Sequence, residues 1–273
     1  SDLVSSSEFI SVNSSNIDFF MCLIVFGYKI EKKFDLVFAS NRDEYYNRPT
    51  QSVRIWNNYS GIVGGKDLEK GGTWLGLNMA GNFASVTNYR DPGHSVTGAK
   101  SRGEIVKNFL ISSQNPRDFI KNLSNTAQNY NGFNLVAGNS DELYHYSNRE
   151  GMINELEPGI YGLSNGLINE PWPKVTEAKN KFRSLLENND LSDKNLFGLL
   201  ASEKTYPENK LPDTGLPEEK EKAVSSIFVN TADYGTRSSG LIFMNHNRIR
   251  YTERTYKKGT PDDHSDVIHT IIH

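Results

Sequence analysis

The chain contains a single cysteine, Cys22, which directly follows the methionine at position 21. The apolar run 23–28 behind it has the length and composition of a β-strand, which predicts that the cysteine begins a strand. If the chain starts at Cys22, one residue carries a thiol and an α-amine whose reference pKa is about 7.7–8.0. Such a residue is a nucleophile with its own proton acceptor. Alternatively, Cys22 is a small buried core residue.

The residues before Met21 decide whether that chemistry is available. They are rich in serine and asparagine and contain no lysine or arginine. A secretory signal needs a positive region and a continuous apolar core, so this segment is not one. We interpret residues 1–20 as an N-terminal extension, a pro-segment or an expression remnant. An N-terminal Cys22 requires removal of residues 1–21, or translation from Met21 followed by its removal.

Composition limits the partners and the location of the protein. The 273 residues carry a net charge of −3 and have no long basic tract, so we expect no nucleic-acid partner. The apolar runs are too short to predict an integral membrane span. One cysteine excludes an internal disulfide and fits a reducing, cytoplasmic location. We predict one domain at 21–260 and a C-terminal tail at 261–273, and the oligomeric state stays open.

The hydrophobic pattern predicts strands and helices that are not regularly interleaved. Expected strands are 23–28, 34–40, a glycine-containing hairpin over 73–88, 133–137, 143–147, 160–164, 224–230, 239–245 and 248–255. Expected helices are 102–112, 116–129, one starting at Pro173 and one at about 193–201, with a mobile loop at 203–221. This order favours a layered α+β domain over a doubly wound sheet.

Four polar residues at 41–44, Asn-Arg-Asp-Glu, directly follow the second predicted strand. They are either a solvated turn or part of a functional site. In the functional interpretation the second strand lies beside the first and brings Arg42 and Asp43 to Cys22. Arg42 would favour the thiolate through its charge, and Asp43 would bind the α-ammonium or a substrate nitrogen.

Several motifs in the same order resemble the NRDE family, also called the transport and Golgi organisation protein 2 family. Besides the cysteine and the 41–44 motif, they are Gly-Gly-Thr-Trp-Leu-Gly at 71–76, Val-Thr-Asn-Tyr-Arg at 86–90, Gly-Leu-Ser-Asn at 162–165 and Tyr-Gly-Thr-Arg-Ser-Ser at 234–239. The resemblance runs from residue 21 to about 256. It implies a four-layer αββα sandwich of the N-terminal-nucleophile hydrolase type, with a more distant similarity to penicillin V acylases and bile salt hydrolases.

The resemblance also implies roles for six residues. Cys22 takes the nucleophile position, and Arg42 and Asp43 stand where the distant group has an arginine and an aspartate, although that pair is not adjacent there. Asn88 and Asn165 correspond to oxyanion donors, which in known cases contribute on the order of 3 kcal/mol. Arg237 resembles a late arginine that steadies the nucleophile. The predicted catalytic residues are therefore Cys22, Arg42, Asp43, Asn88, Asn165 and Arg237.

Two functions of different classes follow. The first is a cysteine amidohydrolase that cleaves linear C–N amide bonds of a small molecule and needs no cofactor or metal. The alternative is a non-catalytic haem or lipid binding or trafficking factor, which the eukaryotic members of the family imply, with Cys22 as a thiolate ligand of haem. The same resemblance implies association with an organelle or the Golgi as an alternative to a cytoplasmic location. The predicted loops near 45–70, 90–100 and 203–221 would set specificity.

Overall fold

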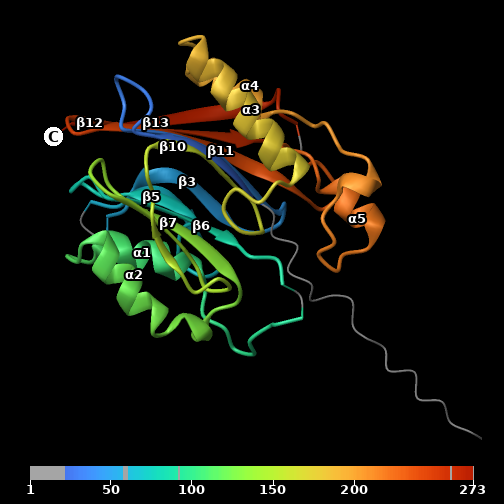
Figure 1. Ribbon diagram of the computed structural model, residues 1–273, viewed down its shortest axis with the longest axis horizontal. Helices are drawn as coiled ribbons and strands as arrows, with labels where there is room; N and C mark the ends of the chain where they lie inside the picture. The colour runs from blue at the N-terminus through green and yellow to red at the C-terminus, as the bar shows by residue number, and fades with distance from the viewer. Residues whose placement is uncertain (1–21, 58–60, 92, 259, 273) are drawn as a thin grey trace, which may run out of the picture.

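Two antiparallel sheets lie face to face in the computed structural model, and helices cover the outer surface of each sheet (Figure 1). The structure describes residues 22–57, 61–91, 93–258 and 260–272. The architecture is the four-layer αββα sandwich, so the predicted fold class is confirmed. The predicted extension at 1–20 lies outside the described residues.

The six-stranded sheet carries the start of the described chain as its second strand, next to an edge strand. Its strand order is β10-β1-β2-β11-β12-β13, with every neighbouring pair antiparallel. The strands are β1 (Cys22–Tyr28), β2 (Leu36–Tyr45), β10 (Gly159–Leu163), β11 (Tyr234–Asn245), β12 (Arg248–Tyr256) and β13 (His264–Ile272). Because β1 and β2 have partners on both sides, their backbone groups are paired along the sheet.

The seven-stranded sheet follows chain order, β3-β4-β5-β6-β7-β8-β9. Its strands are β3 (Thr50–Ile55), β4 (Val63–Asp67), β5 (Leu75–Leu77), β6 (Phe83–Asn88), β7 (Phe133–Gly138), β8 (Leu143–Ser147) and β9 (Ile153–Glu155). The predicted hairpin is β5–β6, and Gly81 adopts a φ of 85° in its turn, a conformation that glycine tolerates.

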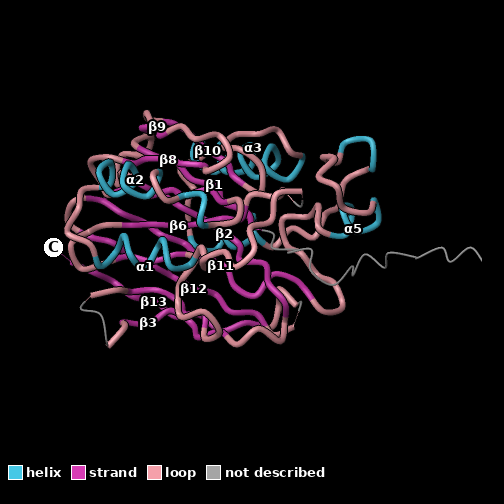
Figure 2. The backbone as a smooth tube through the Cα atoms, turned by 90° about the horizontal axis from the view of Figure 1, so that it is seen from below, coloured by secondary structure: helices cyan, strands magenta, loops and turns pink. Residues whose placement is uncertain are grey.

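Helices cover both outer faces of the sandwich. They are α1 (Gly103–Ile111), α2 (Pro116–Ser124), α3 (Pro173–Glu187), α4 (Asp193–Leu200) and α5 (Glu218–Ala223), with 3-10 turns at Ala127–Asn129 and Glu208–Lys210. Helices α1 and α2 lie on the seven-stranded sheet, and α3 and α4 on the six-stranded sheet (Figures 1 and 2). Pro116 and Pro173 occupy first-turn positions, where a missing N–H costs nothing. No helix in the described ranges is long and apolar enough to cross a membrane.

Strand alternation divides the apolar residues of β1 and β2 between two layers. Ile24 and Phe38 point between the sheets, whereas Leu23, Val37 and Ala39 point toward α3 and α4. The same alternation continues into the polar end of β2, because successive strand residues face opposite sides of a sheet. It therefore fixes which layer each polar side chain of the 41–44 motif enters.

Four expectations from the sequence need correction. The segment near 45–70, predicted as a loop, contains strands β3 and β4. The second strand does not end at residue 40, because residues 41–44 form the second half of β2. Their side chains are buried, since β1 and β11 flank the strand, and this excludes the solvated turn, one of the two alternatives left open.

Residues 224–230 form no strand. The backbone N–H groups of Phe228 and Val229 bond to the carbonyl oxygen of Ser202 and to Thr236 Oγ1, and only an isolated bridge joins Asn230 to Gly235. The expected tail at 261–273 contains β13, which pairs with β12 along its whole length.

Candidate active site

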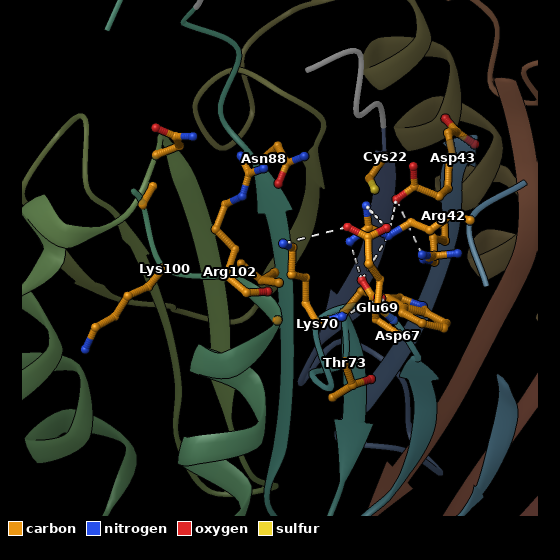
Figure 3. A pocket seen from close by; sticks show the side chains of 18 residues that line it. Cys22, Arg42, Asp43, Asp67, Glu69, Lys70, Thr73, Asn88, Lys100 and Arg102 are labelled. Atoms are coloured by element: carbon orange, nitrogen blue, oxygen red, sulfur yellow. Dashed lines mark hydrogen bonds and ion pairs between the residues drawn. The ribbon is translucent and has the colours of Figure 1, made fainter. Parts of the chain in front are cut away.

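A cavity of about 360 Å³ opens where the start of β1 meets the ends of β2 and β6 (Figure 3). Cys22, Arg42, Asp43 and Asn88, which the sequence placed in one site, all line this cavity. They come from three strands of two sheets, so only the tertiary structure brings them together. The other walls come from β4, the segment that follows it and the residues before α1.

Cys22 is the first residue of β1 and pairs with Arg42 of β2. The residue is partly exposed, but its surroundings desolvate the thiol. Burial, with the negative charge of Asp43 as the next contribution, raises the pKa of the Cys22 thiol to about 12. The backbone N–H of Asp43 and the charge of Arg42 oppose this shift. With residues 1–21 attached, Cys22 is therefore a neutral thiol at physiological pH.

The main-chain nitrogen of Cys22 points at the amide of Asn165. It donates a hydrogen bond to Asn165 Oδ1 at 3.3 Å, while Asn165 Nδ2 donates to the carbonyl oxygen of Asn88 at 2.9 Å. Ser164 Oγ donates to the Cys22 carbonyl oxygen at 2.8 Å. The side chain of Asn165 thus holds the nitrogen of Cys22. The oxyanion-donor role implied by the resemblance stays a prediction.

Arg42 is held rigidly beside the cysteine. Its guanidinium carbon lies 4.1 Å from the centre of the Trp74 ring. Its nitrogens contact Thr50 Oγ1 at 3.3 Å and Glu44 Oε2 at 3.5 Å. Trp74 can lie close to β4 because residue 65 is glycine, and a Cβ there would come within 2.4 Å of the ring. Trp74 thus positions a charged group of the site.

Asp43 belongs to the opposite face of β2 from Arg42. Its Oδ1 accepts a hydrogen bond of 2.6 Å from Thr236 Oγ1, and its Oδ2 is buried with no hydrogen-bond partner in the described part of the chain. Burial raises the pKa of the Asp43 carboxyl, and the nearby ammonium of Lys174 opposes the increase. An incompletely satisfied buried carboxylate beside a nucleophile is a common feature of catalytic sites.

Asn88 and Arg237 have different relationships to the cavity. Asn88 ends β6 and lines the cavity close to Cys22, where its side-chain amide faces the open space (Figure 3). Arg237 stands at a bulge in β11 and donates to the carbonyl oxygens of Tyr45 and Arg48, at 2.8 and 3.0 Å. Within the described residues it is not part of the cavity lining, and it stabilises the turn between β2 and β3.

The outer members of the 41–44 motif have structural contacts. Asn41 Nδ2 donates to the carbonyl oxygens of Leu200 and Ile227, at 2.9 and 2.8 Å, which ties α4 and the following segment to β2. Glu44 accepts from its neighbouring backbone N–H of Tyr45 and contacts Arg42. The motif therefore combines three residues that line the cavity, Arg42, Asp43 and Glu44, with Asn41, which holds the strand in place.

Sequence reasoning missed two residues close to the site. Ser164 binds the carbonyl oxygen of Cys22. It belongs to the Gly-Leu-Ser-Asn motif, and its position directly before Asn165 could have indicated that it lies near the site. Lys174 lies near the start of α3 and is only 2 % exposed, and its ammonium charge interacts with the carboxylate of Asp43. Nothing in the local sequence distinguishes this lysine from the surface lysines of the same helix.

Comparisons with known proteins agree with the fold. A family model described as Transport and Golgi organisation 2 matches residues 21–258. The Transport and Golgi organization 2 homolog of Mus musculus is 34 % identical over 259 residues, which cover 86 % of this chain and 93 % of that protein. The homolog of Homo sapiens is 33 % identical over 257 residues, covering 86 % and 93 %. The chain therefore belongs to the transport and Golgi organisation 2 family.

A solved structure shares the architecture at much lower identity. A variant of the conjugated bile acid hydrolase from Clostridium perfringens aligns with a TM-score of 0.51 and 10 % identity, over 92 % of this chain and 97 % of that chain. At that identity the likeness concerns the fold alone. It supports the sandwich of the N-terminal-nucleophile hydrolase type and leaves the chemistry to be argued from the side chains of this protein.

Proposed function

We propose that this member of the transport and Golgi organisation 2 family is a cysteine amidohydrolase whose active form begins at Cys22. Its substrate is a linear amide that enters the cavity beside β1. The observation that carries the proposal is the hydrogen bond from the Cys22 main-chain nitrogen to Asn165 Oδ1. Cleavage of the peptide bond before Cys22 turns that nitrogen into an α-amine that is already oriented next to the thiol.

The raised thiol pKa supports a requirement for cleavage. Burial and neighbouring carboxylates disfavour the thiolate while Cys22 is peptide-linked. A new α-amine accepts the thiol proton and becomes an ammonium group, whose positive charge favours the thiolate beside it. The fixed guanidinium of Arg42 acts in the same direction. Cleavage thus converts an inert thiol into a nucleophile.

The proposed reaction proceeds through a thioester. The Cys22 thiolate attacks the amide carbon, and the developing oxyanion is placed to accept a hydrogen bond from Asn88 Nδ2. The C–N bond breaks as the leaving amine takes a proton from the α-ammonium. Water then attacks the thioester, the α-amine accepts its proton, and the acid and the free thiol are released. The net reaction consumes one amide and one water and yields one carboxylic acid and one amine.

The lining of the cavity favours an amide with polar groups. Of its eighteen residues, only Trp74, Val86 and Ala99 have side chains that are predominantly apolar. Haem and lipid chains need extensive apolar contact, so the alternative of a haem or lipid carrier has no specific support from this lining. It stays a prediction, which a haem titration followed by its visible spectrum tests in wild type and Cys22→Ala.

The test compares two forms of the protein, one beginning at Cys22 and one with residues 1–273. Each is incubated with a panel of acyl p-nitroanilides, and intact mass is measured during a single turnover. We expect a transient acyl adduct on Cys22 and release of nitroaniline only from the form that begins at Cys22. Cys22→Ala in the same form is the matched control. Failure of the form with a confirmed free α-amine to react with any amide or with an acylating electrophile would refute the proposal.

A further inference from the structure

Lys174 occupies a place that is unfavourable for a positive charge. It is the second residue of α3 and only 2 % exposed. Burial disfavours an ammonium group, and the amide dipoles at the start of a helix also repel a cation. Lysines are rarely buried to this degree unless they are paired. Lys174 Nζ donates a hydrogen bond to the carbonyl oxygen of Val224 at 3.2 Å, which satisfies a donor but supplies no negative charge.

Asp43 lies in the same layer of the molecule. Asp43 lies on the same face of β2 as Ala39, four residues earlier. Ala39 packs in the apolar cluster beneath α3 and α4, and Val175, next to Lys174, belongs to that cluster. Both buried charges therefore lie between the six-stranded sheet and its helices. Burial raises the pKa of Asp43 and lowers that of Lys174. The attraction between the two charges acts against burial, because it favours the charged form of each group.

The other charges near this pair are balanced or lie on the opposite face of β2. Arg90 Nη1 and Glu221 Oε2 form an ion pair of 2.8 Å, with both side chains 7 % exposed. Arg42 and Glu44 project toward the space between the sheets and contact each other. Among the described residues that act on Asp43, Lys174 makes the largest contribution that favours its charged form. The charged and titratable groups around the pair are Cys22, Arg42, Glu44, Arg90 and Glu221.

We propose that Lys174 is a positioning residue of this site, which keeps Asp43 ionised so that Asp43 can bind the α-ammonium of a chain beginning at Cys22. Cys22 pairs with Arg42, the residue before Asp43, and both Cys22 and Asp43 line the cavity, so the two residues are close together. The ionisation of Asp43 does not depend on the proposed hydrolase activity, whereas its role toward the α-ammonium rests on that function. The two parts therefore need separate measurements.

The first experiment uses the full chain, so it is independent of cleavage before Cys22. Infrared titration with ¹³C-labelled aspartate follows the protonated carboxyl band of Asp43, which Asp43→Asn identifies by its disappearance. We expect Lys174→Met to move this titration upward by about one to three pH units, the effect of removing a neighbouring opposite charge. Lys174→Arg restores the charge and should bring the titration back toward the wild-type value. An unchanged titration in Lys174→Met would overturn the proposal.

A second measurement needs no variant that might fail to fold. In wild type, ¹⁵N resonances of lysine side chains are followed over the same pH range. The ammonium signal of Lys174 should inflect at the pH where the Asp43 band changes, because the two charges interact. Separate titrations without a shared inflection would contradict the proposal even if Lys174→Met is unstable.

A third measurement concerns the α-ammonium itself. In the form that begins at Cys22, the pKa of the α-amine is obtained from the pH dependence of its acetylation. Lys174→Met should lower this pKa by about one unit or more, since a protonated Asp43 no longer favours the ammonium, and Lys174→Arg should restore it. If the Asp43 titration shifts and the α-amine pKa does not, Lys174 controls Asp43 but the link to Cys22 is wrong. The hydrolysis assay described above decides the proposed function separately.

Discussion

The two halves of β2 differ in chemistry although both are buried. In the first half, Phe38 stacks with Phe26 and meets Phe83 edge to face, at centroid distances of 5.9 and 4.9 Å. In the second half, Arg42 and Asp43 are no more than 6 % exposed, and specific partners surround each of them. One strand therefore runs from an ordinary apolar core into a buried polar site.

The apolar half of β2 stabilises the fold, whereas the buried polar half provides groups for chemistry. Apolar side chains stabilise the sandwich roughly in proportion to the area they bury. Each buried charge costs free energy unless another group compensates it, and the compensation at this end is incomplete, as the orphan Asp43 Oδ2 shows. We infer that the polar half of β2 is maintained for function at the expense of stability, and the following variants test that comparison.

The largest expected effect is in the apolar half. Phe38→Ala removes a fully buried ring between two sheets and should lower the free energy of unfolding by about 3–5 kcal/mol. Cys22→Ala, the control on β1 beside the polar half of β2, should change it by less than about 1 kcal/mol. Urea denaturation of the full chain measures both, and similar losses at the two positions would remove the proposed distinction.

A buried carboxyl at the polar end makes stability depend on pH. Burial raises the pKa of Glu253 from 4.5 to about 7, so its stabilising contribution is present below pH 4.5 and is lost as the pH rises through 7. Relative to Glu253→Gln, wild type should lose about 2–3 kcal/mol of unfolding free energy between pH 4.5 and 8.

The comparison with Glu253→Gln also cancels the effect of His145 on the free energy of unfolding, which changes with pH in the opposite direction to that of Glu253. Burial lowers the pKa of His145 to about 4, so its contribution is present above pH 6.5 and is lost on acidification through pH 4. Both proteins contain His145, and this effect cancels in their difference. Denaturation at a series of pH values provides the measurement, and a difference that does not vary with pH would show that Glu253 is not responsible.

Removing the Asn165 side chain, which links the start of β1 to the segment after β10, should lower the free energy of unfolding by an intermediate amount. Asn165→Ala leaves the Cys22 main-chain nitrogen and the Asn88 carbonyl oxygen without their partner, which should cost about 1–3 kcal/mol of stability. Asn122→Ala removes an exposed amide that contacts Gln114 and should have an effect within about 0.5 kcal/mol. Thermal and urea unfolding distinguish the two. Equal effects would mean that water replaces the contacts of Asn165.

The smallest predicted effect concerns the ring that supports Arg42. Trp74→Leu removes a cation–π contact of about 0.5–1 kcal/mol and lets the guanidinium move away from the thiol. The thiol pKa should then rise, and iodoacetamide should alkylate Cys22 about two- to five-fold more slowly at pH 9. Trp56→Leu is the matched control, because its cation contact is with Lys66 outside the cavity lining. Intact mass gives both rates, and parallel changes would exclude a specific role for Trp74.

Much of the architecture could be predicted from local pattern. The strands that begin at Cys22 and Leu36, the β5–β6 hairpin and the helices that start at Pro116 and Pro173 have clear apolar periodicity and proline signals. The extension of β2 through residue 45 could not, because polar side chains in sequence normally indicate solvent. Pairing with β11, almost two hundred residues away, keeps those side chains inside the protein.

The candidate site divides along the same line. By itself the sequence determined a lone cysteine at a strand start, a polar tetrapeptide that follows the next strand and a set of family motifs. Together they selected six residues, Cys22, Arg42, Asp43, Asn88, Asn165 and Arg237, of which the first four line the cavity. Only the tertiary structure decided that Asn165 holds the nitrogen of Cys22 and that Arg237 binds the turn between β2 and β3. It also decided that Lys174 shares a layer with Asp43. The physical reason is that hydrogen bonding and charge compensation depend on distance in space, which strand pairing and helix packing set between residues far apart in the chain.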